Sequence, residues 1–98
     1  MDKQRAIAAL TKHADEIRAF GVTHVFMFGS TARDEARRGS DVDLFFDLRR
    51  GSRFSLFDLM DLRSYLRKIL GTKADAIPRN GLHRAIRRDV LREAVRVF

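Results

Sequence analysis

Two short apolar segments constrain the fold of this chain most. Residues 22–28 (VTHVFMF) form an unbroken run rich in β-branched and aromatic residues, which is typical of a buried strand. Residues 41–48 (DVDLFFDL) instead alternate, as the side chains of a strand do on its two faces. One face would carry Val42, Leu44 and Phe46, and the other would carry Asp41, Asp43, Phe45 and Asp47. The two segments predict strands of a small sheet with one apolar and one partly acidic face.

Helical signals surround these strands. Apolar residues recur at steps of three and four before Gly21, which is the spacing of a helix with one buried face, and Leu82, Ile86 and Val90 mark a last helix. Ser55 and Asp58 resemble a capping box, which marks a helix start. The patterns predict helices over 2–20, 31–36, 55–70 and 82–95, and a third, short strand over 73–77. The order α-β-α-β-α-β-α predicts an α/β fold, a small mixed sheet flanked by helices.

Composition narrows the class of protein. The chain has 98 residues, enough for one domain, which we expect to span residues 1–98. No apolar run reaches the length of a membrane span, and cysteine is absent, which fits a cytoplasmic location and excludes thiolate metal sites. The net charge of +7 indicates a phosphate-bearing or acidic partner, or simply an arginine-rich surface. The aromatic residues fall within apolar runs, so nucleic acid is not expected as a direct ligand.

The segment that carries chemistry joins the two main strands. Gly29 and Ser30 follow the first strand, where a glycine allows a sharp bend and a close approach to a ligand, and where the start of a helix favours anions. Asp41 and Asp43 stand two residues apart on the next strand, so both carboxylates point the same way. Such oxygen ligands suit Mg²⁺, which keeps water and substrate phosphates as its other ligands. The pattern therefore predicts a site for one or two Mg²⁺ ions and a polyphosphate.

This spacing resembles the signature of the nucleotidyltransferase superfamily, whose fold is similar to the palm of DNA polymerase β. The longer stretch FMFGSTARDEARRGSDVDLFFDL resembles the minimal (MNT) branch, in which FGS-x-ARG is followed by SD-x-DL. The C-terminal VLREAVRVF is similar to that branch as well, so the resemblance spans nearly the whole chain. Asp34 departs from the pattern, because the branch often has glycine there. The matching residues are Phe28, Gly29, Ser30, Ala32, Arg33, Ser40, Asp41, Asp43 and Leu44.

The resemblance implies roles for individual residues. The superfamily has a third carboxylate on a later strand, and Asp75 matches it best. Asp47 is the competitor, but at ~3.3 Å per residue it lies ~13 Å along the strand from Asp43. Asp41, Asp43 and Asp75 would bind the metal, and Asp75 would help to deprotonate the attacking hydroxyl group. The outer phosphates of ATP would bind to Gly29 and Ser30, whereas Arg33 would either stabilise the leaving pyrophosphate or form a surface ion pair.

The acceptor is implied by the resemblance alone. Members of the MNT branch are commonly paired with a HEPN-domain RNase toxin, so the chain would be an antitoxin that transfers AMP from ATP to a tyrosine of that toxin. It would then form a hetero-oligomer with the toxin. Two alternatives remain open at this point. The chain could modify a small molecule or an RNA end, or it could neutralise its partner by binding alone.

Overall fold

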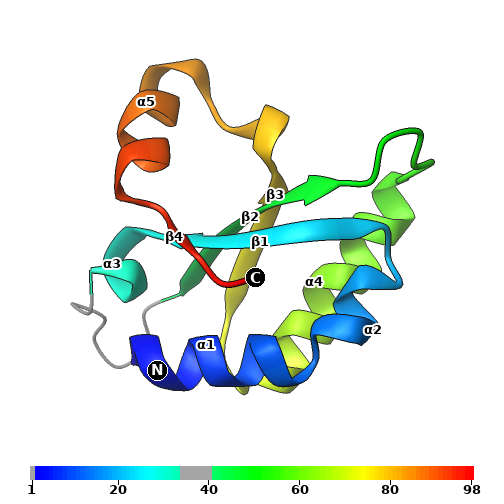
Figure 1. The fold of residues 1–98 in the computed structure, drawn as a ribbon, viewed down its shortest axis with the longest axis horizontal. Coiled ribbons are helices and arrows are strands. Elements are labelled where there is room, and N and C mark those ends of the chain that lie inside the picture. Colours follow the sequence, from blue (N-terminus) through cyan, green and yellow to red (C-terminus); the bar gives the residue numbers. More distant parts are fainter. Residues whose placement is uncertain (1, 34–40) are drawn as a thin grey trace.

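The computed structural model describes residues 2–33 and 41–98. It confirms the α/β class and adds a short strand at the C-terminal end (Figure 1). Along the chain the elements are α1 (Lys3–Lys12), α2 (Ala14–Arg18), β1 (Val22–Phe28), α3 (Gly29–Ala32), β2 (Val42–Leu48), α4 (Leu56–Leu70), β3 (Ala74–Pro78), the 3₁₀ turn η1 (Arg79–Gly81), α5 (Arg84–Glu93) and β4 (Val95–Arg96).

The strands form a single mixed sheet in the order β3-β2-β1-β4. β1 pairs with β2 and β4 in antiparallel fashion, whereas β2 and β3 are parallel and are connected through α4. The acidic strand β2 therefore lies inside the sheet, between the apolar strand β1 and the edge strand β3. This placement brings residues from three separate segments of the sequence next to each other.

The two faces of the sheet are covered unequally. One face packs on α1, α2 and α4 and forms the main core, which includes Leu10, Ile17, Met27, Leu44, Phe46, Leu62 and Leu66. The opposite face carries a smaller cluster in which Phe45 packs with Leu82 and Val90 beneath α5. Figure 1 shows α1 on one side of the sheet and α5 on the other. Because Asp43 and Phe45 are two residues apart, the acidic face is the one that α5 covers only in part.

Most predicted element positions are confirmed. β1 has the predicted bounds, and β2 begins at Val42, one residue after the predicted start. Helix α4 begins after a complete capping box, in which the Ser55 hydroxyl accepts the Asp58 N–H and the Asp58 carboxylate accepts the Ser55 N–H. It ends at Gly71, which adopts a left-handed conformation with φ 69°. The local signals were sufficient here because each helix terminus supplies its own hydrogen-bond partners.

The prediction of one continuous helix over residues 2–20 was wrong. The helix is interrupted at His13, whose backbone leaves the helical region and whose ring nitrogen lies 3.2 Å from the Tyr65 hydroxyl of α4. The break gives two short helices that bury Leu10 and Ile17 against the same core. The side-chain contact with α4 is long-range, so the helical spacing of the N-terminal segment contains no sign of it.

The last predicted helix was too long. Helix α5 ends at Glu93, and Val95 and Arg96 pair with the free edge of β1. This pairing satisfies backbone groups that would otherwise stay open at a sheet edge. Ile86, one of the apolar residues that mark this helix in the sequence, is 50% exposed, because α5 contacts the sheet through Val90 near its end.

The short predicted helix at 31–36 is only partly described. Helix α3 spans Gly29–Ala32, so Ser30 lies in its first turn and not at its N-cap, because the chain turns at Gly29 directly after β1. Residues 34–36, and with them Asp34, lie outside the described residues, as does Ser40. Within the ranges that the structure describes, no helix is both long and apolar enough to cross a membrane.

Candidate active site

Asp43 occupies the centre of the candidate site. In the sheet it lies directly opposite Phe28 on β1 and directly opposite Asp75 on β3. Residues paired in this way project their side chains from the same face. The sheet register therefore places the Asp43 carboxylate between the end of β1, where Gly29 follows Phe28, and the Asp75 carboxylate. Asp41 stands one residue before β2, exposed to solvent.

Gly29 passes close to the Asp43 carboxylate. Its φ is +74°, a left-handed conformation that side chains other than glycine rarely adopt. A Cβ atom at this position would lie 2.6 Å from Oδ2 of Asp43, closer than real Cβ contacts allow. The bend after β1 therefore requires glycine for two independent reasons. It also brings the Gly29–Ser30 backbone beside the central carboxylate.

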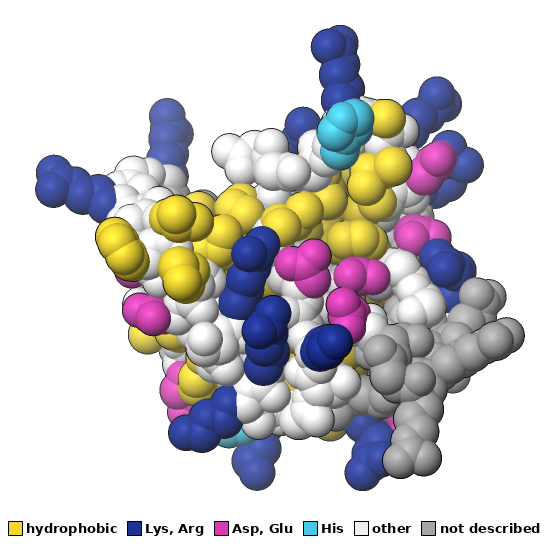
Figure 2. Space-filling model, turned by 180° about the vertical axis from the view of Figure 1, so that it is seen from behind, with side chains coloured by type: hydrophobic (Ala, Val, Ile, Leu, Met, Phe, Trp, Pro, Cys, Tyr) yellow, Lys and Arg dark blue, Asp and Glu magenta, His cyan; other side chains and the backbone are white. Residues whose placement is uncertain are grey.

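Negative charge accumulates at this position. The pKa of Asp43 is raised above its ordinary value, first by burial and then by the neighbouring charges of Asp75 and Asp41. Each of these causes disfavours the ionised carboxylate. Figure 2 shows a group of acidic side chains gathered on one face of the molecule, with basic side chains beside it. A bound cation would relieve this repulsion.

The donor set fits a divalent cation that also binds phosphate. Within residues 2–33 and 41–98, no three acidic or histidine side chains form a ready-made metal-binding group. Mg²⁺ does not require such a group, because it is usually held by one or two carboxylates together with substrate phosphates and water. Asp41 and Asp43 provide two carboxylates, two residues apart at the start of β2, and so meet that requirement.

Arg63 of α4 contacts the third predicted carboxylate. Its Nε donates to the carbonyl oxygen of Ala76 at 2.9 Å, and its Nη2 lies 3.4 Å from Oδ1 of Asp75. The guanidinium group is thus anchored on β3 and forms an ion pair with one oxygen of Asp75, whose side chain is 62% exposed. No local sequence pattern marks Arg63, because only the packing of α4 against β3 brings it to the site.

Glu93, the last residue of α5, ties the glycine bend to Arg33. Its Oε1 accepts the Gly29 N–H at 3.3 Å, and its carboxylate pairs with Arg33 Nη1 at 3.0 Å. Arg33, predicted either to act on pyrophosphate or to pair at the surface, therefore has an ion-pair partner 60 residues away. Glu93 was missed because no local pattern marks a contact of this sequence separation.

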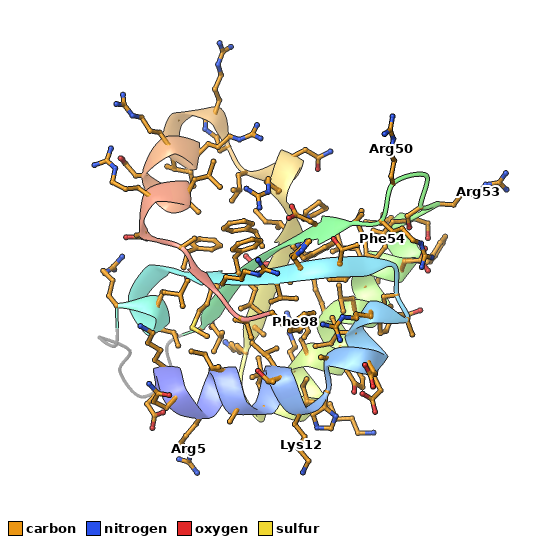
Figure 3. The ribbon with its side chains drawn as sticks, in the orientation of Figure 1. Arg5, Lys12, Arg50, Arg53, Phe54 and Phe98 are labelled. Carbon is orange, nitrogen blue, oxygen red and sulfur yellow. The ribbon has the colours of Figure 1, made fainter. Side chains whose placement is uncertain are left out.

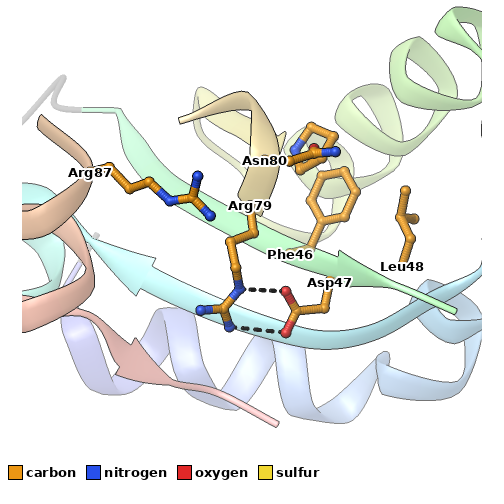
Figure 4. A pocket seen from close by; sticks show the side chains of 7 residues that line it. Phe46, Asp47, Leu48, Arg79, Asn80 and Arg87 are labelled. Atoms are coloured by element: carbon orange, nitrogen blue, oxygen red, sulfur yellow. Dashed lines mark hydrogen bonds and ion pairs between the residues drawn. The ribbon is translucent and has the colours of Figure 1, made fainter. Parts of the chain in front are cut away.

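Asp47, the competing carboxylate, is engaged elsewhere. Arg79 binds it in bidentate fashion, with Nε at 2.6 Å from Oδ1 and Nη2 at 3.0 Å from Oδ2 (Figure 4). The same guanidinium group lies 4.8 Å from the ring centre of Phe26 and 5.1 Å from that of Phe45. The hydrogen bond that Arg79 donates to Asp47 is the main cause that raises the pKa of Arg79. This pair borders an open cavity of about 390 Å³ lined also by Phe46, Leu48, Pro78, Asn80 and Arg87.

We expect Asp47→Asn to weaken the fold without removing the chemistry. Asp47 and Arg79 are only 27% and 35% exposed, so losing the charged acceptor leaves a half-buried guanidinium group poorly paired. The free energy of unfolding should fall by about 1–2 kcal/mol, measured by denaturant titration. The turnover of the folded variant at 25 °C should stay close to that of the wild type. A loss of turnover with no loss of stability would place Asp47 in the active site.

Comparison with known proteins identifies the family. Residues 10–97 match the model of the nucleotidyltransferase domain family. The protein adenylyltransferase MntA of Thermococcus cleftensis is 39% identical over 89 residues, which cover 90% of this chain and 88% of that protein. A candidate protein adenylyltransferase of Methanocaldococcus jannaschii is 35% identical over 96 residues, covering 98% and 94%. This chain belongs to the nucleotidyltransferase domain family, in its minimal, MntA-like form.

Solved structures agree with this assignment. The structure of a candidate minimal nucleotidyltransferase superposes with a TM-score of 0.73 at 36% identity, covering 97% of this chain and 95% of that one. Two more distant structures share the fold. One is a toxin–antitoxin complex with AMP-PNP, with a TM-score of 0.70, 14% identity and coverage of 100% and 73%. The other contains a tri-AMPylated HEPN toxin of Shewanella oneidensis in complex with its MNT antitoxin, with a TM-score of 0.70, 12% identity and coverage of 98% and 71%.

Proposed function

We propose that this chain transfers AMP from ATP, with Mg²⁺, to a tyrosine hydroxyl group of a HEPN-type RNase toxin and thereby acts as its antitoxin. The observation that carries the proposal is the position of Asp43, beside the Gly29 bend and directly opposite Asp75. The sequence identity of 39% with a protein adenylyltransferase supports a protein acceptor. The fold shared with an MNT antitoxin supports a HEPN partner.

Three carboxylates would hold the metal. Asp41, Asp43 and Asp75 would bind one or two Mg²⁺ ions, which supply charge neutralisation to the polyphosphate and to both the attacking and the leaving oxygen. Gly29 would let the backbone pass close to the outer phosphates, and Ser30 would bind them through its backbone N–H and its hydroxyl group, since the Gly29 N–H donates to Glu93. Arg33, held nearby by Glu93, would act on the charge that develops on pyrophosphate.

The transfer itself is an in-line displacement. The acceptor oxygen forms a bond to the α-phosphorus of ATP, and the bond from that phosphorus to the oxygen that bridges to the β-phosphate breaks, so that pyrophosphate leaves. The hydroxyl proton would pass to the oxygen of Asp75 that Arg63 does not bind. Catalysis of such a transfer consists mostly of orienting the reactants and stabilising the charge that develops in the transition state.

A protein acceptor also fits the small size of the fold. The described residues form one sheet with its flanking helices, and none of these elements builds a second lobe over the acidic face. An acceptor that is itself a folded protein would supply the missing wall of the site. The net charge of +7 favours an acidic partner surface.

The decisive experiment is mass spectrometry of a HEPN-domain toxin offered to this chain as the acceptor. The purified partner is incubated with this chain, ATP and Mg²⁺, and its tyrosine peptides are sequenced. We expect a mass increase of one or more AMP units on a tyrosine and loss of RNase activity. An unmodified partner, with label from ATP on RNA ends or on a small molecule, would contradict the proposal. Full neutralisation by an inactive variant would show that binding alone suffices.

Glu93→Ala tests how the phosphate-binding bend is positioned. Removing the carboxylate leaves the Gly29 N–H and Arg33 without this acceptor, so we expect the KM for ATP to rise about tenfold, the equivalent of about 1.4 kcal/mol. The kcat should change less. Glu93→Gln keeps an oxygen that can accept the Gly29 N–H and should recover part of the loss. An unchanged KM for ATP in Glu93→Ala would mean that Glu93 does not position the bend and forms only a surface ion pair with Arg33.

A further inference from the structure

The first two turns of α4 expose an unusual amount of apolar surface. Leu56, Phe57 and Met60, here called the α4 patch, are 69%, 77% and 56% exposed. Later turns of the same helix bury Leu62 and Leu66 in the main core. Contiguous exposed apolar side chains on an otherwise amphipathic helix are typical of an interaction site, because their exposure to water is unfavourable.

The α4 patch is held rigidly in place. The capping box between Ser55 and Asp58 fixes the first turn of the helix. Just before it, Phe54 packs edge-on against Phe46 of the main core, with ring centres 5.6 Å apart. A preorganised surface loses little conformational entropy on binding, so these contacts favour a docking role.

Basic side chains flank the start of the helix that carries the patch. Arg50 and Arg53 are exposed in the preceding loop and project away from the body of the molecule near Phe54 (Figure 3). The capping box engages the Asp58 carboxylate, which leaves Asp61 as the exposed acid on these turns. An apolar centre with a mainly basic rim is complementary to a protein surface with an apolar centre and acidic neighbours.

The α4 patch lies on the same face of the molecule as the candidate active site. Leu56, Met60 and Arg63 are spaced by four and three residues, so they line one side of the helix. Arg63 contacts Asp75 at the sheet edge, about one helical turn beyond Met60. Figure 2 shows exposed hydrophobic side chains and the acidic group on the same face, with basic side chains between them. A partner seated on the patch would therefore reach the carboxylates.

We propose that the α4 patch is the docking surface for the protein acceptor, which this chain would bind through an apolar anchor with acidic neighbours. The proposal rests on the proposed function, because it takes the acceptor to be a protein. It assigns binding of the partner to residues that do not touch ATP or the metal. Mutating the patch should thus affect acceptor binding separately from nucleotide binding.

The test compares Phe57→Ser and Met60→Ser with the control Ile86→Ser, which removes a 50% exposed apolar side chain on α5. The probe is the HEPN-domain toxin that the proposed function takes as the acceptor. We expect its dissociation constant without ATP, and its KM in the transfer reaction, to rise at least about tenfold in the patch variants. The dissociation constant for ATP and the melting temperature should match the wild type, and Ile86→Ser should bind normally.

The two proposals can fail separately. If the wild type binds the HEPN protein but does not modify it, the function is wrong, and loss of binding in Phe57→Ser still supports the docking surface. If the patch variants bind and modify the partner as the wild type does, the docking surface is wrong. A wild-type dimer that dissociates in Phe57→Ser, seen by sedimentation, would also overturn the proposal, since a second copy would then cover the patch.

Discussion

Asp43→Asn is expected to abolish AMP transfer while making the protein more stable. The variant loses the carboxylate that we propose binds the metal at the centre of the site, so kcat/KM should fall by at least about 10³-fold. It also removes the repulsion from Asp75 and Asp41 and the burial of a charge, the causes that raise the pKa of Asp43. In metal-free buffer at neutral pH we expect a higher melting temperature, with a gain below about 1 kcal/mol, because solvent screens this partly exposed group.

The pH dependence of stability provides a second readout. Since the pKa of Asp43 is raised in the folded state, the protonated carboxyl group favours folding relative to the ionised one. Its contribution is complete below the unfolded-state pKa of about 3.9 and is lost as the pH rises through the folded-state pKa. The stability gain of Asp43→Asn over the wild type should therefore appear as the pH rises from the unfolded-state pKa to the folded-state pKa of Asp43, and it should persist at higher pH.

Asp47→Asn is the matched control on the same strand face. It should show the opposite combination, lower stability with retained transfer, because Asp47 is paired with Arg79. If Asp43→Asn kept wild-type turnover, the proposed metal site would be wrong. If Asp43→Asn were inactive but less stable than the wild type, a neighbouring group would stabilise the ionised Asp43 carboxylate in the folded state. That result would contradict the raised pKa of Asp43.

Local sequence signals were sufficient to predict most of the elements. The apolar run of β1, the alternation in β2 and the Ser55 capping box each depend on residues a few positions apart. The pairing of these elements does not follow from such signals. The register that places Asp43 opposite Asp75 depends on a parallel pairing formed across α4, and a shift of one residue would turn Asp75 to the other face. Asp75 was predicted from a family resemblance. Asp47 competed with it because it shares the strand face of Asp43, and its distance of ~13 Å along the strand was the argument against it.

The residues that were missed act over long sequence separations. Glu93 reaches Gly29 and Arg33 only because α5 folds back over the end of β1. The strand of Val95 and Arg96 is too short to give a pattern and is defined by the free edge of β1. Arg63 lies in an ordinary helical repeat, and only the packing of α4 beside β3 directs its guanidinium group to Asp75. These contacts are properties of the tertiary structure and have no counterpart in neighbouring residues.

Gly29→Ala is expected to impair both stability and activity. An alanine at φ +74° is strained, and its Cβ would lie 2.6 Å from Oδ2 of Asp43, so the bend or the carboxylate must move. The backbone strain and the displacement together should lower the free energy of unfolding by about 1–3 kcal/mol. A shift of about 1 Å in a reacting group can cost about 10² in rate, and we expect kcat/KM to fall at least that far.

Gly51→Ala separates the two causes of this effect. Gly51 has φ +80°, close to that of Gly29, but a Cβ there would meet nothing within 4 Å. The alanine at position 51 should therefore show the cost of backbone strain alone, a lower free energy of unfolding with unchanged kcat/KM. The difference between the two variants measures the contact of the bend with Asp43. Equal activities would mean that the bend does not set the position of the carboxylate, and the phosphate-binding role of Gly29 would then have no geometric support.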